Sequence, residues 1–118
     1  MGTYTWIDGS TYNGFWRMNK LSGNGVMNWA DGRTFEGGFK NNMIHGVGTF
    51  RWPNGMRYEG EYKADKRDGK GVMVYEDGKI FEGNWKGGNP HGSGKLVLSD
   101  GRERKGEWVY GRLQGWIS

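Results

Sequence analysis

Gly92-Ser93-Gly94-Lys95 is a stretch whose residue types could do chemistry, because glycine-rich loops that end in lysine cradle phosphate groups. The required pattern, G-x-x-x-x-G-K-[ST], is not met: Asn89 stands in place of its first glycine, and Leu96 in place of its serine or threonine. The same Gly-x-Gly recurs at Gly23/Gly25, Gly46/Gly48 and Gly69/Gly71. We therefore interpret this stretch as structural and expect no nucleotide cofactor.

His45 and His91 could ligate a metal, but they occupy equivalent positions two units apart in a repeating pattern. If each unit supplies two strands about 4.8 Å apart, roughly four strands separate the two imidazoles. The chain has no cysteine to complete a ligand set. We expect these histidines to pack or cap in loops, and we predict no metal site.

Rows of carboxylates next to lysines could in principle supply acid and base groups. Such sites need irregular, convergent placement, whereas these residues recur evenly, which favours a solvated face of charged pairs between strands. We predict no catalytic residues. The rows are Glu36, Glu59, Glu82 and Glu107, beside Lys40, Lys63 and Lys86.

Basic residues interleaved with aromatic ones can bind single-stranded nucleic acid by stacking. Here the net charge is only +4, with a pI near 9.4, and the aromatic residues occupy regular positions that a folded core needs. We expect no nucleic-acid partner and only a mild bias towards acidic partners.

All of these residues belong to a 23-residue unit, exemplified by Tyr58–Ile80, that keeps its register without insertion from Gly2 to Gly115. Aromatic residues hold the first, fifth and eighteenth places in most copies, and glycine the third, twelfth and fourteenth. An Asp-Gly or Asn-Gly pair follows. The first-place residues are Tyr12, Phe35, Tyr58 and Phe81, with Arg104 as the exception; the fifth-place residues are Trp16, Phe39, Tyr62, Trp85 and Trp108.

Apolar and polar residues alternate within the unit, which predicts two half-buried strands joined by an Asp-Gly hairpin turn. We expect a second connection of about six residues, such as Lys63–Asp68. The expected architecture is one all-β domain, 1–118, built as an elongated, twisted antiparallel sheet. Its hairpins are 2–16, 25–39, 48–62, 71–85 and 94–108, with a tail, 109–118, that either pairs as a last strand or frays.

Composition supports an ordered repeat. Only 34% of residues are apolar and 24 are glycine, but seven Trp, six Tyr and five Phe recur at fixed places, and each buries a large area when stacked. The absence of cysteine, of a signal-peptide pattern and of a run of roughly 20 apolar residues leads us to expect a cytoplasmic protein.

The unit YEGEYKADKRDGKGVMVYEDGKI resembles the MORN repeat (membrane occupation and recognition nexus), as do FEGGFKNNMIHGVGTFRWPNGMR and FEGNWKGGNPHGSGKLVLSDGRE. The resemblance covers the whole chain and departs from the pattern at Leu98, Arg104 and Ile117. It implies an interaction module of the kind found in cytoskeletal and ciliary scaffolds, in junctional membrane proteins, and fused to lipid kinases or a SET-type methyltransferase. The partners it implies are amphipathic helices, a second copy of the array, or acidic phospholipids.

Three function hypotheses follow. The first is a non-catalytic protein scaffold whose aromatic groove receives an amphipathic helix or another copy, lined by Tyr12, Trp16, Trp29, Phe35, Phe39, Trp52, Tyr58 and Tyr62. The second is binding to acidic phospholipid membranes through Lys63, Lys66, Arg67 and Lys70, although Asp65 and Asp68 reduce the charge of that cluster. The third is an accessory segment of a larger enzyme such as a lipid kinase.

Two further surfaces could recruit partners. Four apolar residues in the expected loops either fold back onto the neighbouring hairpin or form an exposed patch for a partner: Met18, Leu21, Met43 and Ile44. A linear sheet also has two unpaired edges. We expect a homodimer to form at the uncharged N-terminal edge, 2–6, sooner than at the C-terminal end, where Arg102–Glu107 is densely charged.

Overall fold

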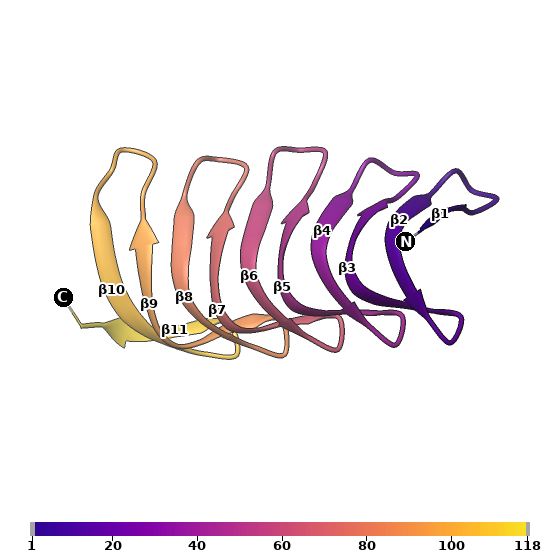
Figure 1. Ribbon diagram of the computed structural model, residues 1–118. Coiled ribbons are helices and arrows are strands. Elements are labelled where there is room, and N and C mark those ends of the chain that lie inside the picture. Colours follow the sequence, from indigo (N-terminus) through magenta and orange to yellow (C-terminus); the bar gives the residue numbers. More distant parts are fainter. Residues whose placement is uncertain (1, 118) are drawn as a thin grey trace.

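The computed structural model describes residues 2–117 as one antiparallel sheet in which strands follow each other in chain order (Figure 1). The all-β prediction is confirmed, and the shape is elongated, with extents of 48 × 25 × 18 Å. Residues 2–117 contain no helix long and apolar enough to cross a membrane. The strands are β1 (Gly2–Thr5), β2 (Thr11–Arg17), β3 (Lys20–Asn28), β4 (Thr34–Lys40), β5 (Met43–Arg51), β6 (Arg57–Lys63), β7 (Lys66–Val74), β8 (Ile80–Lys86), β9 (Asn89–Val97), β10 (Glu103–Val109) and β11 (Arg112–Trp116).

The Asp-Gly and Asn-Gly pairs form the turns along one long edge of the sheet. In the turn between β7 and β8, the carboxylate of Asp77 accepts the N–H of Lys79 at 3.0 Å, and the N–H of Gly78 donates to the carbonyl of Tyr75 at 3.0 Å. Gly78 has a φ of +92°, a conformation that glycine adopts without strain. The equivalent turns repeat these bonds, so the predicted hairpin turns are present.

Along the opposite long edge, the connections are shorter than the six residues that we expected. Lys63 and Lys66 pair directly, and only Ala64-Asp65 forms the turn, with φ of +48° and +69°. Two consecutive residues with positive φ are typical of a type I′ turn, whose twist matches that of the strands it joins. Met18-Asn19, Asn41-Asn42 and Gly87-Gly88 have the same conformation. The residues assigned to loops therefore extend the strands, which explains why β3, β5, β7 and β9 each have nine residues.

A row of glycines paired with one another crosses the sheet from β1 to β10, and at this row the strand registers shift and the hairpins bend. Because these residues lack Cβ, an aromatic ring lies directly on the backbone: a Cβ on Gly71 would stand 2.5 Å from Cε1 of Tyr58. The row is Gly2, Gly14, Gly25, Gly37, Gly48, Gly60, Gly71, Gly83, Gly94 and Gly106.

The core is a ladder of aromatic rings inside this bend. Each first-place ring is almost completely buried and contacts the fifth-place ring of its own repeat and that of the next, edge to face, with centroids 4.8–5.5 Å apart. Edge-to-face pairs are favourable beyond their burial. Because each rung touches only its neighbours, the core is continuous but has no centre. The first-place rings are Tyr12, Phe35, Tyr58 and Phe81.

The tail pairs as a last strand, β11, one of the two expected outcomes. The charged segment Arg102–Glu107 therefore does not form the C-terminal edge: most of it lies in β10, which is paired on both sides. The edge is β11, where Leu113 and Trp116 are exposed. The expectation that Arg102–Glu107 forms the C-terminal edge is wrong, because the edge strand β11 carries a single charged residue, Arg112, beside its exposed apolar residues. The preference for a homodimer at the N-terminal edge stays a prediction.

Candidate binding groove

The stretch that resembles a phosphate loop lies within β9 and is occupied by structural contacts. Gly94 belongs to the glycine row. The ammonium group of Lys95 lies 3.4 Å from a carboxylate oxygen of Glu103, and the hydroxyl of Ser93 donates to Glu107 at 2.8 Å. These contacts follow from the strand register and form no anion cradle.

The two histidines cap turns, as expected. The N–H of Ala64 donates to Nδ1 of His45 at 3.4 Å, and the N–H of Tyr110 donates to Nδ1 of His91 at 3.1 Å. Each histidine thereby supports the two-residue turn of the following repeat. Within residues 2–117, no group of three His, Asp or Glu side chains could hold a metal ion.

Three hollows of about 600, 320 and 350 Å³ follow one another along the inner side of the bend. Residues from equivalent places of successive repeats line all three, and we call this row of hollows the inner groove. One wall consists of eighteenth-place aromatic residues and the other of tenth-place residues. The aromatic wall is Trp6, Trp29, Trp52 and Tyr75; the opposite wall is Leu21, Ile44, Arg67 and Pro90.

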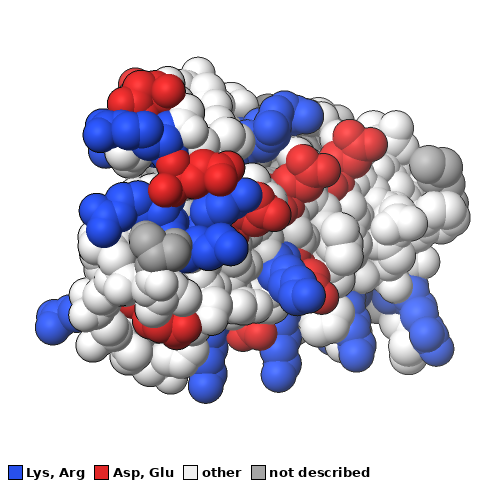
Figure 2. All heavy atoms as spheres, turned by 90° about the vertical axis from the view of Figure 1, so that its left-hand side faces the viewer, with Lys and Arg blue, Asp and Glu red and all other residues white. Residues whose placement is uncertain are grey.

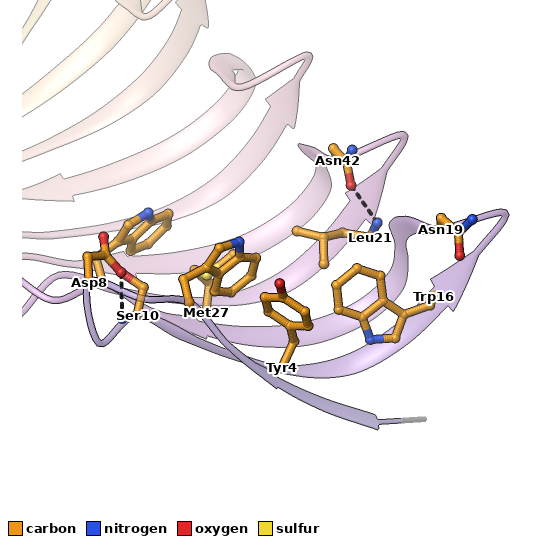
Figure 3. Close-up of a pocket in the computed structure, with 10 residues that line it drawn as sticks. Tyr4, Asp8, Ser10, Trp16, Asn19, Leu21, Met27 and Asn42 are labelled. Carbon is orange, nitrogen blue, oxygen red and sulfur yellow. Dashed lines mark hydrogen bonds between the residues drawn. The ribbon is translucent and has the colours of Figure 1, made fainter.

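The N-terminal hollow is the widest part of the inner groove, and its rings are the most accessible (Figure 3). Tyr4 from β1 and Trp16 from β2 are 49% and 38% exposed, with ring centroids 5.8 Å apart. Tyr4 also contacts Trp6 at 4.7 Å. Leu21 and Met27 provide an aliphatic base between these rings and the next repeat. Such a cluster of accessible aromatic rings is typical of an anchoring site for a partner.

Hydrogen bonds between consecutive turns hold the tenth-place wall in position. The side chain of Asn42 accepts the N–H of Leu21 at 2.7 Å, and Asp65 accepts the N–H of Ile44 at 2.7 Å. The backbone of each turn also donates to the carbonyl of the wall residue before it, as from Gly88 to Arg67 at 2.9 Å. The groove wall is therefore as regular as the ladder beneath it.

The structure divides the eight residues predicted to line the groove. Four form the buried ladder below its surface: Tyr12, Phe35, Phe39 and Tyr58. The other four line the groove, Tyr62 from its buried floor and three from positions that solvent reaches: Trp16, Trp29 and Trp52. The lining residues that the sequence reasoning missed include Tyr4, Trp6, Tyr75, Pro90 and Leu96. Their places in the 23-residue unit could have identified them, since each stands at the sixteenth, eighteenth or tenth place.

Six segments of the chain match the sequence profile of the MORN repeat: residues 1–11, 12–32, 35–57, 58–80, 81–101 and 105–115. The chain belongs to the MORN-repeat family. The repeats of this family are generally non-catalytic modules for interaction or membrane binding. No curated protein matches the sequence.

The four apolar residues expected in the loops of this MORN array separate into two pairs. Leu21 and Ile44 are buried in the wall of the inner groove, as expected if the chain folds back onto its neighbour. Met18, 85% exposed, and Met43 lie at the surface beside the two-residue turns. The expected apolar loop patch is therefore not a single surface.

The four residues predicted to contact lipid do not form one cluster either. Lys63 and Lys66 flank a two-residue turn, and Arg67 lines the inner groove. Lys70 lies in a different hollow, on the other face of the sheet, together with Glu59 and Glu82. Side chains alternate along β7, so Arg67 points to the opposite face from Lys70, and the four residues do not form one surface. Their contact with lipid stays a prediction.

A different basic surface does exist in the MORN array. Along the edge of two-residue turns, Lys and Arg side chains project in a row at the bottom of Figure 2, away from most of the acidic groups. Asp65 is the one acidic residue in these turns. We call this row the basic edge; it consists of Arg17, Lys20, Lys40, Lys63, Lys66, Lys86 and Arg112, all exposed.

Tyr62, on the floor of the MORN groove, makes the stability of the fold depend on pH in the alkaline range. Burial raises the pKa of Tyr62 to about 12, although the nearby charge of Arg67 opposes the shift. The folded pKa lies above the usual value of about 10, so stabilisation is complete below pH about 10 and is lost as the pH rises through 12. We expect the unfolding free energy of the wild type to fall more steeply between pH 10 and 12 than that of Tyr62→Phe, measured by urea titration. Parallel curves would contradict the assignment.

Proposed function

We propose that this MORN array is a non-catalytic binding module whose inner groove receives an amphipathic α-helix of a protein partner. The observation that carries the proposal is the groove itself: a row of hollows that follows the repeats and offers Tyr4, Trp16, Trp29 and Trp52 to solvent. Aromatic side chains are the commonest energetic anchors of protein interfaces. The module could act as an independent scaffold or as the repeat segment of a longer protein.

The chemistry of the groove favours a helix over an extended segment. The strands beneath the groove pair with their neighbours throughout, so an inserted strand would find few free backbone groups with which to pair. Its own N–H and C=O groups would lose water without gaining partners, which is costly. A helix satisfies its backbone internally and presents only side chains.

The repeat spacing also suits a helix. Each repeat contributes two strands, and strands lie about 4.8 Å apart, so equivalent places recur roughly every 9.6 Å along the groove. Seven residues of an α-helix advance about 10.5 Å. A helix lying along the groove therefore presents about one side chain per heptad to each repeat. The 48 Å length of the array matches a helix of about 32 residues.

The ionisable groups support a non-catalytic role. The Glu and Lys rows recur evenly, and Lys95 bridges Glu82 and Glu103 at 3.9 and 3.4 Å in a solvated pair network. Such an arrangement stabilises neighbouring strands and differs from the convergent placement that a nucleophile and base require.

A second candidate function is peripheral binding to acidic phospholipid membranes. The basic edge favours it, because seven basic residues align there beside only two acidic ones, Asp65 and Asp68, and Met18 is exposed in one of the turns. Each basic residue near an anionic leaflet contributes about 1 kcal/mol. Co-sedimentation with vesicles that contain acidic lipid separates the candidates: strong, salt-sensitive pelleting, lost when Lys40, Lys63 and Lys86 are changed to Glu, would favour the membrane.

The helix proposal is tested by selecting binders from a display library of 30-residue peptides tiled across the proteome of the source organism. We expect enriched peptides to have apolar residues every three to four positions. The double variant Trp16→Glu/Trp52→Glu should weaken their binding at least a hundredfold, because two aromatic anchors are lost.

The matched control is Phe15→Glu/Val47→Glu, which introduces the same charges at exposed residues that do not line the groove. We expect the control to bind like the wild type. Enriched peptides without helical periodicity, or peptides lost equally on both double variants, would overturn the proposal.

A further inference from the structure

Arg67 breaks the apolar character of one groove wall. Leu21, Ile44 and Pro90 hold the equivalent tenth place in the other repeats that form this wall. The guanidinium of Arg67 lies 5.0 Å from the ring centroid of Trp85, and Nη2 donates to the carbonyl of Gly88 at 2.9 Å. These contacts fix a planar cation halfway along the groove.

The charge of Arg67 is not matched by an acidic side chain. Among residues 2–117, no carboxylate oxygen lies within 4.0 Å of its guanidinium. Asp65 lines the same hollow, but its carboxylate accepts the N–H of Ile44, and Lys66 adds a second positive charge. Asp68, next in sequence, accepts the N–H of Gly87 at 3.5 Å. The central hollow therefore has a net positive charge and free guanidinium donors.

We propose that Arg67 selects a helix that carries a Glu or Asp at the position facing the central repeat, with apolar residues facing the repeats before it. This inference rests on the proposed function and names the chemistry of the partner. A carboxylate matches the guanidinium fork and forms a charge-assisted hydrogen bond with it. The adjacent basic edge favours further acidic residues on the same flank of the helix.

The fold also fixes the spacing of the residues that the selected helix presents to the groove. Ile44 precedes Arg67 by one repeat and Leu21 by two, which correspond to about one and two heptads of helix. The selected helix therefore has a large apolar residue for the N-terminal hollow. A second apolar residue lies about seven positions away along the helix, and the carboxylate about seven positions beyond it, whichever way the helix runs.

Arg67 also rejects other helices. An apolar residue at the facing position would cover the guanidinium without supplying an acceptor, and an uncompensated charge removed from water is unfavourable. A lysine there would add repulsion. Specificity at this position therefore comes from excluding mismatched helices as well as from binding the acidic one.

The test uses the peptides enriched on the wild-type chain, selected in parallel on Arg67→Leu and on Lys70→Leu, a basic residue on the other face of the sheet. Leucine already occupies the equivalent place at Leu21, so Arg67→Leu is compatible with the wall. We expect an acidic residue at the position two heptads from the first apolar anchor on the wild type and on Lys70→Leu, and an apolar residue there on Arg67→Leu. For the best wild-type peptide, Arg67→Leu should weaken binding at least tenfold, and changing the peptide's acid to leucine should restore it on the variant.

The outcomes separate the two proposals. Helical binders with no acidic preference, or an equal loss on Lys70→Leu and Arg67→Leu, would overturn the role of Arg67 and leave the helix-binding function standing. The absence of any helical binder would overturn both. Binding to acidic vesicles, without binding to any peptide, would assign Arg67 and Lys66 to membrane binding. It would also overturn the selective role of Arg67.

Discussion

Gly71→Val should destabilise the array by at least about 3 kcal/mol, because the added branched side chain must displace the ring of Tyr58. Tyr58 is completely buried and lies between two other rings of the ladder. A Cβ at residue 71 would stand 2.5 Å from the ring carbon Cε1, so the buried ring or the backbone would have to shift. Gly60→Val should behave similarly, because its Cβ would stand 2.5 Å from Cα of Gly71.

The measurement is urea unfolding followed by both tryptophan fluorescence and circular dichroism, since repeat arrays can unfold in parts. Gly115→Val is the matched control: no atom outside its own segment lies within 4 Å of a Cβ at that position. We expect the control to unfold near the wild-type midpoint. If Gly71→Val also did so, the close contact between ring and backbone would be contradicted.

Phe35→Ala should cost about 3–5 kcal/mol, the range for truncating a buried phenylalanine. The Phe35 ring is completely buried and contacts Phe39, Phe50 and Tyr62 at centroid distances of 5.4, 6.2 and 5.5 Å. Its removal would leave a cavity in the middle of the ladder and interrupt the contact between two repeats. Because stability in such arrays depends on the interfaces between neighbouring repeats, the loss of stability should extend to the repeats on both sides of Phe35.

Phe15→Ala provides the comparison, because Phe15 is 48% exposed and is not part of the buried core. We expect its unfolding free energy to change by less than about 1 kcal/mol. Equal effects of the two substitutions, measured by urea unfolding, would mean that the ladder does not dominate the stability of the fold.

The sheet and its core were predictable because their residue types repeat. Gly60 and Gly71 recur with their equivalents at fixed places, and so do the rings that cover them, so the packing of ring on backbone followed from spacing alone. Trp16 shows the limit of this reasoning. It holds the same place as Phe39, yet Phe39 contacts two first-place rings, whereas Trp16, at the start of the ladder, contacts one first-place ring, Tyr12, and the exposed ring of Tyr4. Position along the array therefore decides exposure where the repeat pattern cannot.

The turns and the groove were harder to predict, for a physical reason. Lys63–Asp68 is rich in charged residues, a composition typical of a loop. A two-residue turn, however, needs only two residues with positive φ. Ala64-Asp65 adopts these angles although it is not one of the Asn- or Gly-containing pairs that such turns prefer. Asn41-Asn42 and Gly87-Gly88 do carry that signal. Arg67 was assigned to a lipid patch because it lies among other basic residues in the sequence, and only the fold shows that the tenth place forms a wall.

The claim that a helix lies along the inner groove, across the strands, is tested most directly by attaching a spin label to an enriched peptide. The label is placed first at one end and then at the other, and line broadening of the tryptophan indole signals is recorded by NMR. We predict that one labelled end broadens the signals of Trp6 and Trp16, and the other those of Trp85 and Trp108, at opposite ends of the array. Broadening of the same indoles from both ends, or of the edge strands β1 or β11 alone, would contradict this account.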